Sequence, residues 1–379
     1  MKVCYTTASF LYGAGVGKFS VNLVKELSKR HDITLVTNNY QSKVGNIKVR
    51  EYNAFKWPGW LRIESIANNG THAVRKLDEI EKFDVIHGQG EQFHQDVLSI
   101  HGCHRSWIDE VRKEKGKLYT LASKLHFETK CVLDIEKRQF EHKRYKKIAA
   151  ISFKIKNDLM KYFNVPEEDI EVIHVGLNFG DFCINNKEKK FIRKKIRAHH
   201  GIGMDKDLLL FVGQAFYKKG LGELIRALPF VADSKLLIVG NDNPVPFQNL
   251  ARKLDVSGRV IFAGNVPKIS DYYHASDAFV FPTKNEPFGV VITEAMAAGL
   301  PVVTSADAGA AELIKDGRSG ILINNSRNVL QIENKVNMLL SSRRLMRKIS
   351  INGRRVAKTT DWKFTAKKFE KLYEQTMKC

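Results

Sequence analysis

Short apolar segments alternate with amphipathic ones along most of the chain, and the alternation restarts once near its middle. The first series opens with a strand candidate at residues 1–10 and a helix candidate at residues 19–30. The second series runs from a strand at residues 207–214 to a strand at residues 300–305. Strands that alternate with helices in this way form parallel sheets covered by helices. The sequence therefore predicts an α/β protein with two doubly wound domains.

The chain length agrees with this division, because 379 residues are hard to arrange around a single hydrophobic core. Between the two series lies a basic run, residues 185–197, with seven basic residues and one acidic residue. A charge run in such a position is usually a solvated linker or the solvated face of a helix. We expect one of these two structures there.

The net charge favours an anionic partner. Lys and Arg number 62 and Asp and Glu number 41, which gives a net charge of +21. Such an excess attracts nucleic acid, phosphorylated small molecules or an acidic membrane surface, although lysines also serve simply to keep a surface soluble. The five cysteines contain no CxxC pair, so we expect neither a zinc site nor a disulfide framework. Without a signal-peptide pattern or a membrane-spanning apolar run, a cytoplasmic protein is favoured.

A glycine-rich turn follows the first strand, with Gly13, Gly15 and Gly17 spaced as GxGxG. It matches neither the Walker phosphate loop nor the GxGxxG dinucleotide fingerprint. Glycines between a strand and a helix nevertheless allow the backbone to approach an anion at the helix N-terminus. A plain tight turn is an equally good interpretation of this segment.

The sequence gives no sign of a metal site. Asp205 and Asp207 form a DxD pattern that resembles a known metal-binding motif, but the pattern precedes a strand. Ligands in parallel sheets bind beyond the carboxyl ends of the strands, at the other edge. We therefore expect no bound metal.

Two lysines open the helix that follows the strand at residues 208–213. Lys218, Lys219 and Gly220 stand at the turn between this strand and the helix. A lysine at this position can reach a phosphate held at the strand ends. A solvated surface lysine is the alternative.

Two glutamates, Glu286 and Glu294, bracket a segment that is otherwise almost wholly apolar. A buried carboxylate is costly unless it is paired or hydrogen-bonded, so this spacing needs a reason. We expect Glu286 on a loop after a strand, and a buried helix over residues 288–298 with Gly289 in its first turn. The acids would then flank one end of a crevice, with free helix amides between them, which suits a nucleotide sugar. A helix cap and a core salt bridge are the alternative roles for the two acids.

With these motifs the sequence resembles the retaining glycosyltransferases of family 4, which have the GT-B fold. The resemblance rests on the glutamate block and on four further segments that together span nearly the whole chain: GAGVGKFSVNLVKEL, IEVIHVGLN, FVGQAFYKKG and SDAFVFPT. It implies two Rossmann-like domains that face a cleft, an acceptor-binding domain at residues 1–176 and a nucleotide-sugar domain at residues 177–356. The final helix, residues 357–379, would pack back on the first domain.

The family's residue roles transfer to the matching positions. Glu294 would bind the nucleotide ribose, Glu286 would contact the donor sugar, and Val266 would lie near the base. His101 fits the family's pocket residue beside the transferred sugar. The groups implied to hold the diphosphate are Lys219, Gly15, Phe288, Gly289 and Val290. The resemblance thus makes His101, Lys219 and Glu286 the catalytic candidates.

One position departs from the family pattern. Gln214 follows Gly213 where most members have arginine, so one cationic contact to the diphosphate is missing and donor binding would depend more on Lys219. A subgroup that adds glucose to heptose in lipopolysaccharide cores also lacks this arginine. The segments at residues 103–125 and 239–256 are similar to that subgroup as well.

The resemblance implies an enzyme, a hexosyltransferase that retains anomeric configuration and needs neither a metal nor a cofactor. Its donor would be a nucleotide-diphosphate hexose, UDP-glucose above others, and its acceptor a saccharide or lipid-linked glycan of the cell surface. One alternative is another sugar-nucleotide enzyme of the same fold, an epimerase or a sucrose-type synthase. A nucleic-acid-binding protein is suggested only by the charge, since no recognition motif accompanies it.

Aromatic and basic residues gather in the half expected to receive the acceptor. Trp57 and Trp60 lie beside Lys56 and Arg62, and the run at residues 137–147 holds six basic residues. Aromatic residues flanked by cations suit a membrane interface, so we expect peripheral contact with an anionic membrane surface. Tryptophans packed in the core and a solvated helix face are the alternative.

Overall fold

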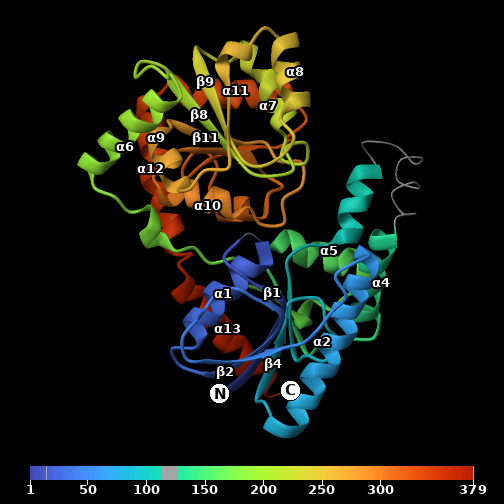
Figure 1. The fold of residues 1–379 in the computed structure, drawn as a ribbon. Helices are drawn as coiled ribbons and strands as arrows, with labels where there is room; N and C mark the ends of the chain where they lie inside the picture. The colour runs from blue at the N-terminus through green and yellow to red at the C-terminus, as the bar shows by residue number, and fades with distance from the viewer. Residues whose placement is uncertain (14, 113–126, 379) are drawn as a thin grey trace. The chain divides into compact units, whose positions relative to one another are not determined.

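A computed structural model describes residues 1–13, 15–112 and 127–378 of the chain (Figure 1). Contacts divide the chain into unit 1, Met1–Gly176 with Trp362–Cys379, and unit 2, Leu177–Asp361. The division after Gly176 coincides with the expected boundary, whereas the returning segment begins at Trp362 because the preceding helix continues to Lys358. Much of the segment 103–125 that carried the subgroup resemblance lies outside the described residues.

The strands described in unit 1 form one parallel sheet in the order β3-β2-β1-β4-β5-β6-β7. Their bounds are β1 Lys2–Phe10, β2 Asp32–Tyr40, β3 Ile47–Glu51, β4 Val85–Gly88, β5 Val97–Ile100, β6 Lys147–Ala150 and β7 Ile170–Val172. Strands β4 and β5 are buried along their whole length, as expected for a sheet covered on both faces. The order reverses between β1 and β4, so the chain leaves these neighbours toward opposite ends of the sheet.

Helices cover this sheet (Figure 1). Their bounds are α1 Gly15–Leu27, α2 Gly59–Glu81, α4 Phe127–Glu141, α5 Phe153–Phe163 and α13 Trp362–Thr376, with a 3-10 turn η1 at Glu167–Asp169. Local sequence sets the ends of α5. The Ser152 hydroxyl accepts the Ile155 N–H at its start, and Asn164 takes a left-handed conformation with φ of 51° at its end.

Unit 2 has a second parallel sheet, with its described strands in the order β10-β9-β8-β11-β12-β13. Their bounds are β8 Asp207–Val212, β9 Ser234–Val239, β10 Val260–Gly264, β11 Ala278–Phe281, β12 Val302–Ser305 and β13 Ile321–Ile323. Here the order reverses between β8 and β11. The two sheets confirm the predicted α/β class with two doubly wound, Rossmann-like domains.

The helices of unit 2 follow the predicted alternation with its strands. Their bounds are α6 Asn186–His199, α7 Leu221–Ala227, α8 Val245–Lys253, α9 Ile269–Ala275, α10 Val290–Ala297, α11 Val329–Leu340 and α12 Arg343–Lys358. Short 3-10 turns lie at η2 Phe179–Phe182, η3 Leu228–Phe230, η4 Ser257–Arg259 and η5 Gly309–Leu313. Helix α10 is buried from Ile292 to Ala297, as its apolar sequence predicts.

The basic run at residues 185–197 is not a linker, because it forms most of α6. Asn185 and Glu188 make a capping box at the start of this helix, each side chain accepting the other residue's backbone N–H. Arg197 is fully buried, donating to the Asp277 carboxylate at 2.5 Å and to three backbone carbonyls. Of the two expected structures, the linker is therefore wrong and the largely solvated helix is confirmed. The exception is Arg197, whose burial depends on a distant partner that local composition does not reveal.

Helix α13 returns to unit 1 and is tied to the sheet through His87 on β4. His87 is fully buried, with Nδ1 2.6 Å from the Tyr373 hydroxyl and Nε2 2.7 Å from Ser99 Oγ. The Phe369 ring stacks on His87 at a centroid distance of 5.1 Å. Burial lowers the pKa of His87 to about 3, so the imidazole is neutral in the folded protein near neutral pH.

We expect His87 to make the stability of unit 1 depend on pH. An unfolded histidine takes up a proton near pH 6.5, whereas folded His87 stays neutral down to about pH 3. The folded state then binds fewer protons over this range, so its stability falls as the pH decreases through it. The free energy of unfolding of the wild type should therefore approach that of His87→Gln as the pH decreases, by about 1.4 kcal/mol for each pH unit.

Urea unfolding followed by tryptophan fluorescence measures this difference. All four tryptophans, Trp57, Trp60, Trp107 and Trp362, belong to unit 1, so the signal reports that unit. A difference that stays constant from about pH 7 to about pH 5 would show that His87 is protonated when folded.

Candidate functional site

The reversal of strand order in unit 2 brings Lys219 and Glu286 together. Lys219 lies in the loop after β8 and Glu286 in the loop after β11, and these two strands are neighbours. Lys219 Nζ and the Glu286 carboxylate form an ion pair, with the side chains only 16% and 13% exposed. Ligands in open parallel sheets bind outside the strand ends at such a reversal. Sequence reasoning placed both residues at this edge, and the structure puts them in contact.

The backbones of the same two loops are also joined. The Lys284 N–H donates to the Lys218 carbonyl at 3.0 Å. Gly220 has a φ of 76°, and a Cβ there would lie 1.9 Å from the Pro282 carbonyl oxygen. Only glycine therefore allows this close approach, which places Lys219 beside Glu286.

Gly289 precedes helix α10 instead of lying within its first turn. Its φ of 94° and ψ of 63° are left-handed, so the helix expected from residue 288 begins at Val290. A Cβ on Gly289 would lie 2.9 Å from Glu286 Cγ, so the glycine makes room for this glutamate. Phe288 is buried, and its carbonyl accepts the Ala310 N–H at 2.7 Å. The first amides of α10 have no acceptor within the helix, which makes its start favourable for an anion.

Glu294 lies within α10 and is only 6% exposed. Tyr273 on α9 donates its hydroxyl to Glu294 Oε2 at 3.0 Å, which fixes the orientation of the carboxylate. Burial and the adjacent Glu294 charge raise the pKa of Tyr273 well above its usual value, so the hydroxyl keeps its proton.

The remaining predicted residues lie in different places. Val266 follows β10 and is half-buried, and Gln214 is exposed just beyond β8. Gly15 begins α1 in unit 1 with a φ of 62°, and His101 directly follows β5 in the same unit. Within unit 2, the structure therefore gathers Lys219, Glu286 and the start of α10, while Gly15 and His101 belong to unit 1.

Unit 1 contains a cavity of about 510 Å³ that touches β1, β2, the segments after β4 and β5, and helices α2 and α4. Its polar lining includes Thr7, Ser9, Asn38, Asn39, Arg62, Gln89, Glu91, Ser99, His101 and Glu136. The cavity lies where the strand order of this sheet reverses, between β1 and β4. It is the position at which this kind of sheet binds ligands.

His101 is held in this cavity by a chain of side-chain hydrogen bonds. Its Nε2 lies 2.7 Å from Gln89 Oε1, and the amide nitrogen of Gln89 lies 3.0 Å from His87 Nε2. The Phe19 ring packs edge-on against the imidazole at 4.6 Å. Burial lowers the pKa of His101 to about 4, so the ring is neutral near pH 7.

Sequence reasoning missed the two carboxyl groups of this cavity, Glu91 and Glu136. Burial raises the pKa of each to about 7. Glu91 accepts the Ala8 N–H at 3.4 Å, and Glu136 accepts the N–H groups of His104 and Arg105 at 2.6 and 3.3 Å. The position of Glu91 just after a strand was a usable signal, whereas Glu136 is one of several charged residues of both signs on α4 and offered none.

The aromatic residues considered for membrane contact are exposed. Trp57 is 83% exposed and Trp60 is 41% exposed, so Trp57 is not a core residue. Several cations of the run at residues 137–147 have acidic partners: Arg138 pairs with Glu64, Lys143 with Asp169 and Lys146 with Asp96. This run is therefore partly neutralised, unlike the charge pattern read from the sequence.

None of the helices in the described ranges combines the length and the apolar character needed to cross a membrane. The same ranges contain no group of three or more His, Cys, Asp or Glu side chains suited to a metal ion. Of the DxD pattern, Asp205 is largely exposed, and Asp207 pairs with Arg343 at 2.9 Å.

The chain is similar to known glycosyltransferases along most of its length. The family model described as Glycosyltransferase Family 4 matches residues 13–180, and the model described as Glycosyl transferases group 1 matches residues 192–356. An uncharacterized glycosyltransferase of Methanocaldococcus jannaschii is 28% identical over 310 residues, which cover 77% of this chain and 76% of that protein. Lipopolysaccharide glucosyltransferase WaaG of Escherichia coli (strain K12) is 29% identical over 294 residues, covering 75% and 74% of the two chains.

Solved structures share the fold. The crystal structure of WaaG matches with a TM-score of 0.78 at 23% identity, covering 98% of this chain and 99% of WaaG. HepE of Anabaena in complex with UDP-glucose matches with a TM-score of 0.72 at 18% identity, covering 99% and 100% of the two chains. At these identities the likeness establishes the arrangement of helices and strands.

The geometry at Gly289 predicts that an alanine there is costly. In Gly289→Ala, the side chain would sit in a left-handed conformation and press on Glu286 Cγ, so we expect a loss of about 1–3 kcal/mol in stability. Gly258→Ala is the matched control, because that glycine has no positive φ and open space around its Cβ position. Calorimetric unfolding compares the two variants, and equal stabilities would contradict the conformation described for Gly289.

Proposed function

Because the chain belongs to the GT-B glycosyltransferases of family 4, we propose that it transfers a hexose from a nucleotide-diphosphate sugar to a saccharide or lipid-linked acceptor. A UDP-glucose type donor is favoured, since WaaG is a glucosyltransferase and HepE has been solved with UDP-glucose. The observation that carries the proposal is the Lys219–Glu286 pair beside the start of α10, at the reversal of strand order in unit 2. We propose that this edge binds the donor.

Each group at this edge suits one part of such a donor. The backbone amides at Phe288, Gly289 and Val290, together with Lys219, would hold the diphosphate. The buried Glu294 carboxylate would accept hydrogen bonds from the ribose hydroxyls. Val266, after β10, would lie near the base.

The ion pair between Lys219 and Glu286 supplies a mechanism for exchange on binding. An incoming diphosphate competes with the Glu286 carboxylate for the Lys219 ammonium group. Once Lys219 turns to the phosphate, the carboxylate of Glu286 is available to accept hydrogen bonds from hydroxyls of the hexose. The same lysine then stabilises the negative charge that develops on the diphosphate as the glycosidic carbon–oxygen bond breaks.

We propose that the cavity of unit 1 receives the acceptor and that Gly15, at the start of α1, contributes to the diphosphate contacts. His101, neutral and held by Gln89, would contact the transferred sugar. Glu91 and Glu136 would accept hydrogen bonds from acceptor hydroxyls. A polyhydroxylated acceptor suits a cavity with this many hydrogen-bonding side chains.

We propose a retaining, metal-independent reaction. The acceptor hydroxyl would attack the anomeric carbon on the face that the diphosphate leaves, and its proton would pass to the departing phosphate oxygen. Lys219 and the amides at the start of α10 carry positive charge toward the diphosphate, which is the task that a metal ion performs in other transferases.

Ligand-dependent thermal unfolding tests the donor assignment. At about 100 times its dissociation constant, a bound nucleotide sugar should stabilise the protein by about 2.7 kcal/mol, so a panel of UDP-, GDP- and ADP-sugars should reveal the preferred base. Glu294→Gln should weaken nucleoside-diphosphate binding about tenfold or more, because a charged acceptor becomes a neutral amide. Unchanged calorimetric affinity in a folded Glu294→Gln protein would refute the ribose role.

We also propose that unit 1 docks peripherally on an anionic inner membrane surface through its exposed aromatic residues. Phe55, Trp57 and Phe127 are 57%, 83% and 69% exposed, and the Trp60 and Phe127 rings lie 6.2 Å apart. Aromatic side chains exposed in this way favour the region between lipid headgroups and acyl chains. A neighbouring lysine or arginine adds about 1 kcal/mol each on an anionic leaflet, less at high salt.

Vesicle co-sedimentation tests this docking. Wild-type protein should bind anionic and not neutral vesicles, with binding reduced at high salt. Replacing Trp57 and Trp60 with serine should reduce it, whereas Phe230→Ser in unit 2, where the phenylalanine is 64% exposed, should not. Equal effects of the two variants, or no binding by the wild type at low salt, would contradict the proposal.

A further inference from the structure

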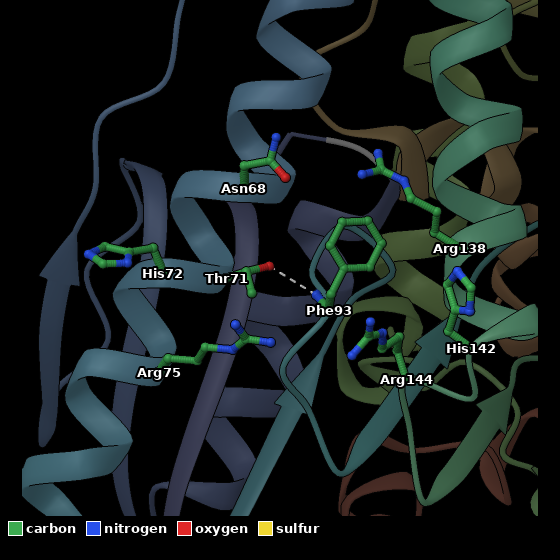
Figure 2. Close-up of a pocket in the computed structure, with 8 residues that line it drawn as sticks. All are labelled: Asn68, Thr71, His72, Arg75, Phe93, Arg138, His142 and Arg144. Atoms are coloured by element: carbon green, nitrogen blue, oxygen red, sulfur yellow. Dashed lines mark hydrogen bonds between the residues drawn. The ribbon is translucent and has the colours of Figure 1, made fainter.

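Unit 1 has a second cavity, of about 310 Å³, between α2 and the end of α4 (Figure 2). None of its lining residues belongs to the cavity that holds His101. Five of the eight side chains that line it are basic, and none is acidic: Arg75, Arg138 and Arg144 with His72 and His142. A cavity lined this way attracts anions.

One wall of the cavity is fixed by Arg138 and Phe93. The Arg138 guanidinium lies over the Phe93 ring at 4.7 Å, and it pairs with Glu64 at 3.2 Å and with Asp134 at 2.8 Å. The Phe93 backbone N–H donates to Thr71 Oγ1 at 3.0 Å, so this aromatic ring is in turn tied to α2. Both acidic partners of Arg138 lie outside the lining, which leaves the interior of the cavity without a carboxylate.

Arg75 and Arg144 supply the charge that is not neutralised. Among the described residues, neither guanidinium has a hydrogen bond or ion pair to an acid, and both residues are exposed. Figure 2 shows them extending toward one another, Arg75 from α2 and Arg144 from the turn after α4. The Arg144 backbone is anchored, with its N–H on the Gln139 carbonyl at 2.9 Å and its carbonyl accepting from Gln95 Nε2 at 3.2 Å.

From this arrangement we infer that the cavity binds a phosphate group. Guanidinium groups match the oxygens of a phosphate with paired hydrogen bonds, and several of them converge here from two elements. The two guanidinium groups repel one another and have no acidic partner. A doubly charged anion between them therefore gives the largest electrostatic stabilisation. The volume is at the lower end of small-molecule sites, so it suits a phosphate with part of the molecule that carries it.

This phosphate site does not depend on the proposed transfer reaction. It belongs to unit 1, whereas Lys219 and the start of α10 belong to unit 2, and it shares no lining residue with the cavity of His101. Its carrier is either a soluble phosphorylated saccharide or the headgroup of a phospholipid, since both present the same phosphate chemistry.

Calorimetric titration of the full chain with inorganic phosphate and with glucose 6-phosphate tests the site. The double variant Arg75→Gln/Arg144→Gln should bind phosphate about tenfold more weakly or worse, since each change removes charged hydrogen bonds. The matched control is Arg50→Gln/Lys76→Gln, which removes two exposed charges of unit 1 outside the cavity and should bind as the wild type does. Because Lys219 is proposed to bind the donor phosphates, the titrations are repeated in a Lys219→Ala background, in which the double variant should still bind phosphate more weakly than the control variant.

Several results would overturn the inference. They are wild-type protein that shows no binding at millimolar phosphate, equal losses of affinity in the double variant and the control, or a Lys219→Ala background in which the double variant no longer lowers the affinity for phosphate. Arg75→Gln alone gives a second measurement if the double variant unfolds, because Arg75 is exposed on α2. Its affinity for phosphate should fall below that of Lys76→Gln, and equal affinities would contradict the site.

Vesicles of phosphatidylglycerol and of phosphatidylcholine separate the two carriers. If the wild type binds glucose 6-phosphate and the double variant does not, the carrier is a soluble phosphorylated saccharide. Selective loss of phosphatidylglycerol binding by the same variant, without glucose 6-phosphate binding by the wild type, supports a lipid headgroup. If the double variant changes neither the binding of glucose 6-phosphate nor the binding of phosphatidylglycerol vesicles, the cavity does not bind phosphate.

Discussion

In each sheet, strand order reverses once, and this reversal determines where chemistry is possible. Two neighbouring strands send their following loops in opposite directions, which leaves an opening that no crossover helix covers. In unit 2 this happens between β8 and β11, and the Lys219–Glu286 ion pair joins the two loops there. In unit 1 it happens between β1 and β4, and the cavity with His101 lies at that edge.

At this edge of unit 2, two glycines make room for the partly buried Lys219–Glu286 ion pair. Gly220 lets the loop after β8 approach the Pro282 carbonyl, and Gly289 leaves room for Glu286 at the start of α10. A side chain at either position would push Lys219 and Glu286 apart. Partial burial strengthens their attraction compared with that of a surface pair.

Most of the fold could be predicted from the sequence, because buried parallel strands are short apolar runs that stand out between polar segments. The grouping of Lys219, Glu286 and Gly289 at one edge of unit 2 could be predicted as well, since each lies between a strand and the helix that follows it. The roles given to these residues, and the exchange at Lys219, stay predictions. What local sequence does not reveal is pairing between distant segments. For this reason the sequence did not reveal that Arg197 is buried against Asp277 or that Glu136 on α4 lines a cavity.

The basic run at residues 137–147 shows how the same charges take different roles once they are folded. From the sequence it is one cationic surface, but Lys143 and Lys146 pair with acids on neighbouring segments. Arg138 packs on Phe93 and is neutralised, while Arg144 keeps its charge and faces Arg75 across a cavity. Net charge therefore indicates an anionic partner without locating it, and the location follows from which cations lack an acidic neighbour. By that criterion the cavity between α2 and α4 is the anion site that we propose, whereas Lys219 is paired with Glu286 and would bind a phosphate only by exchanging this partner.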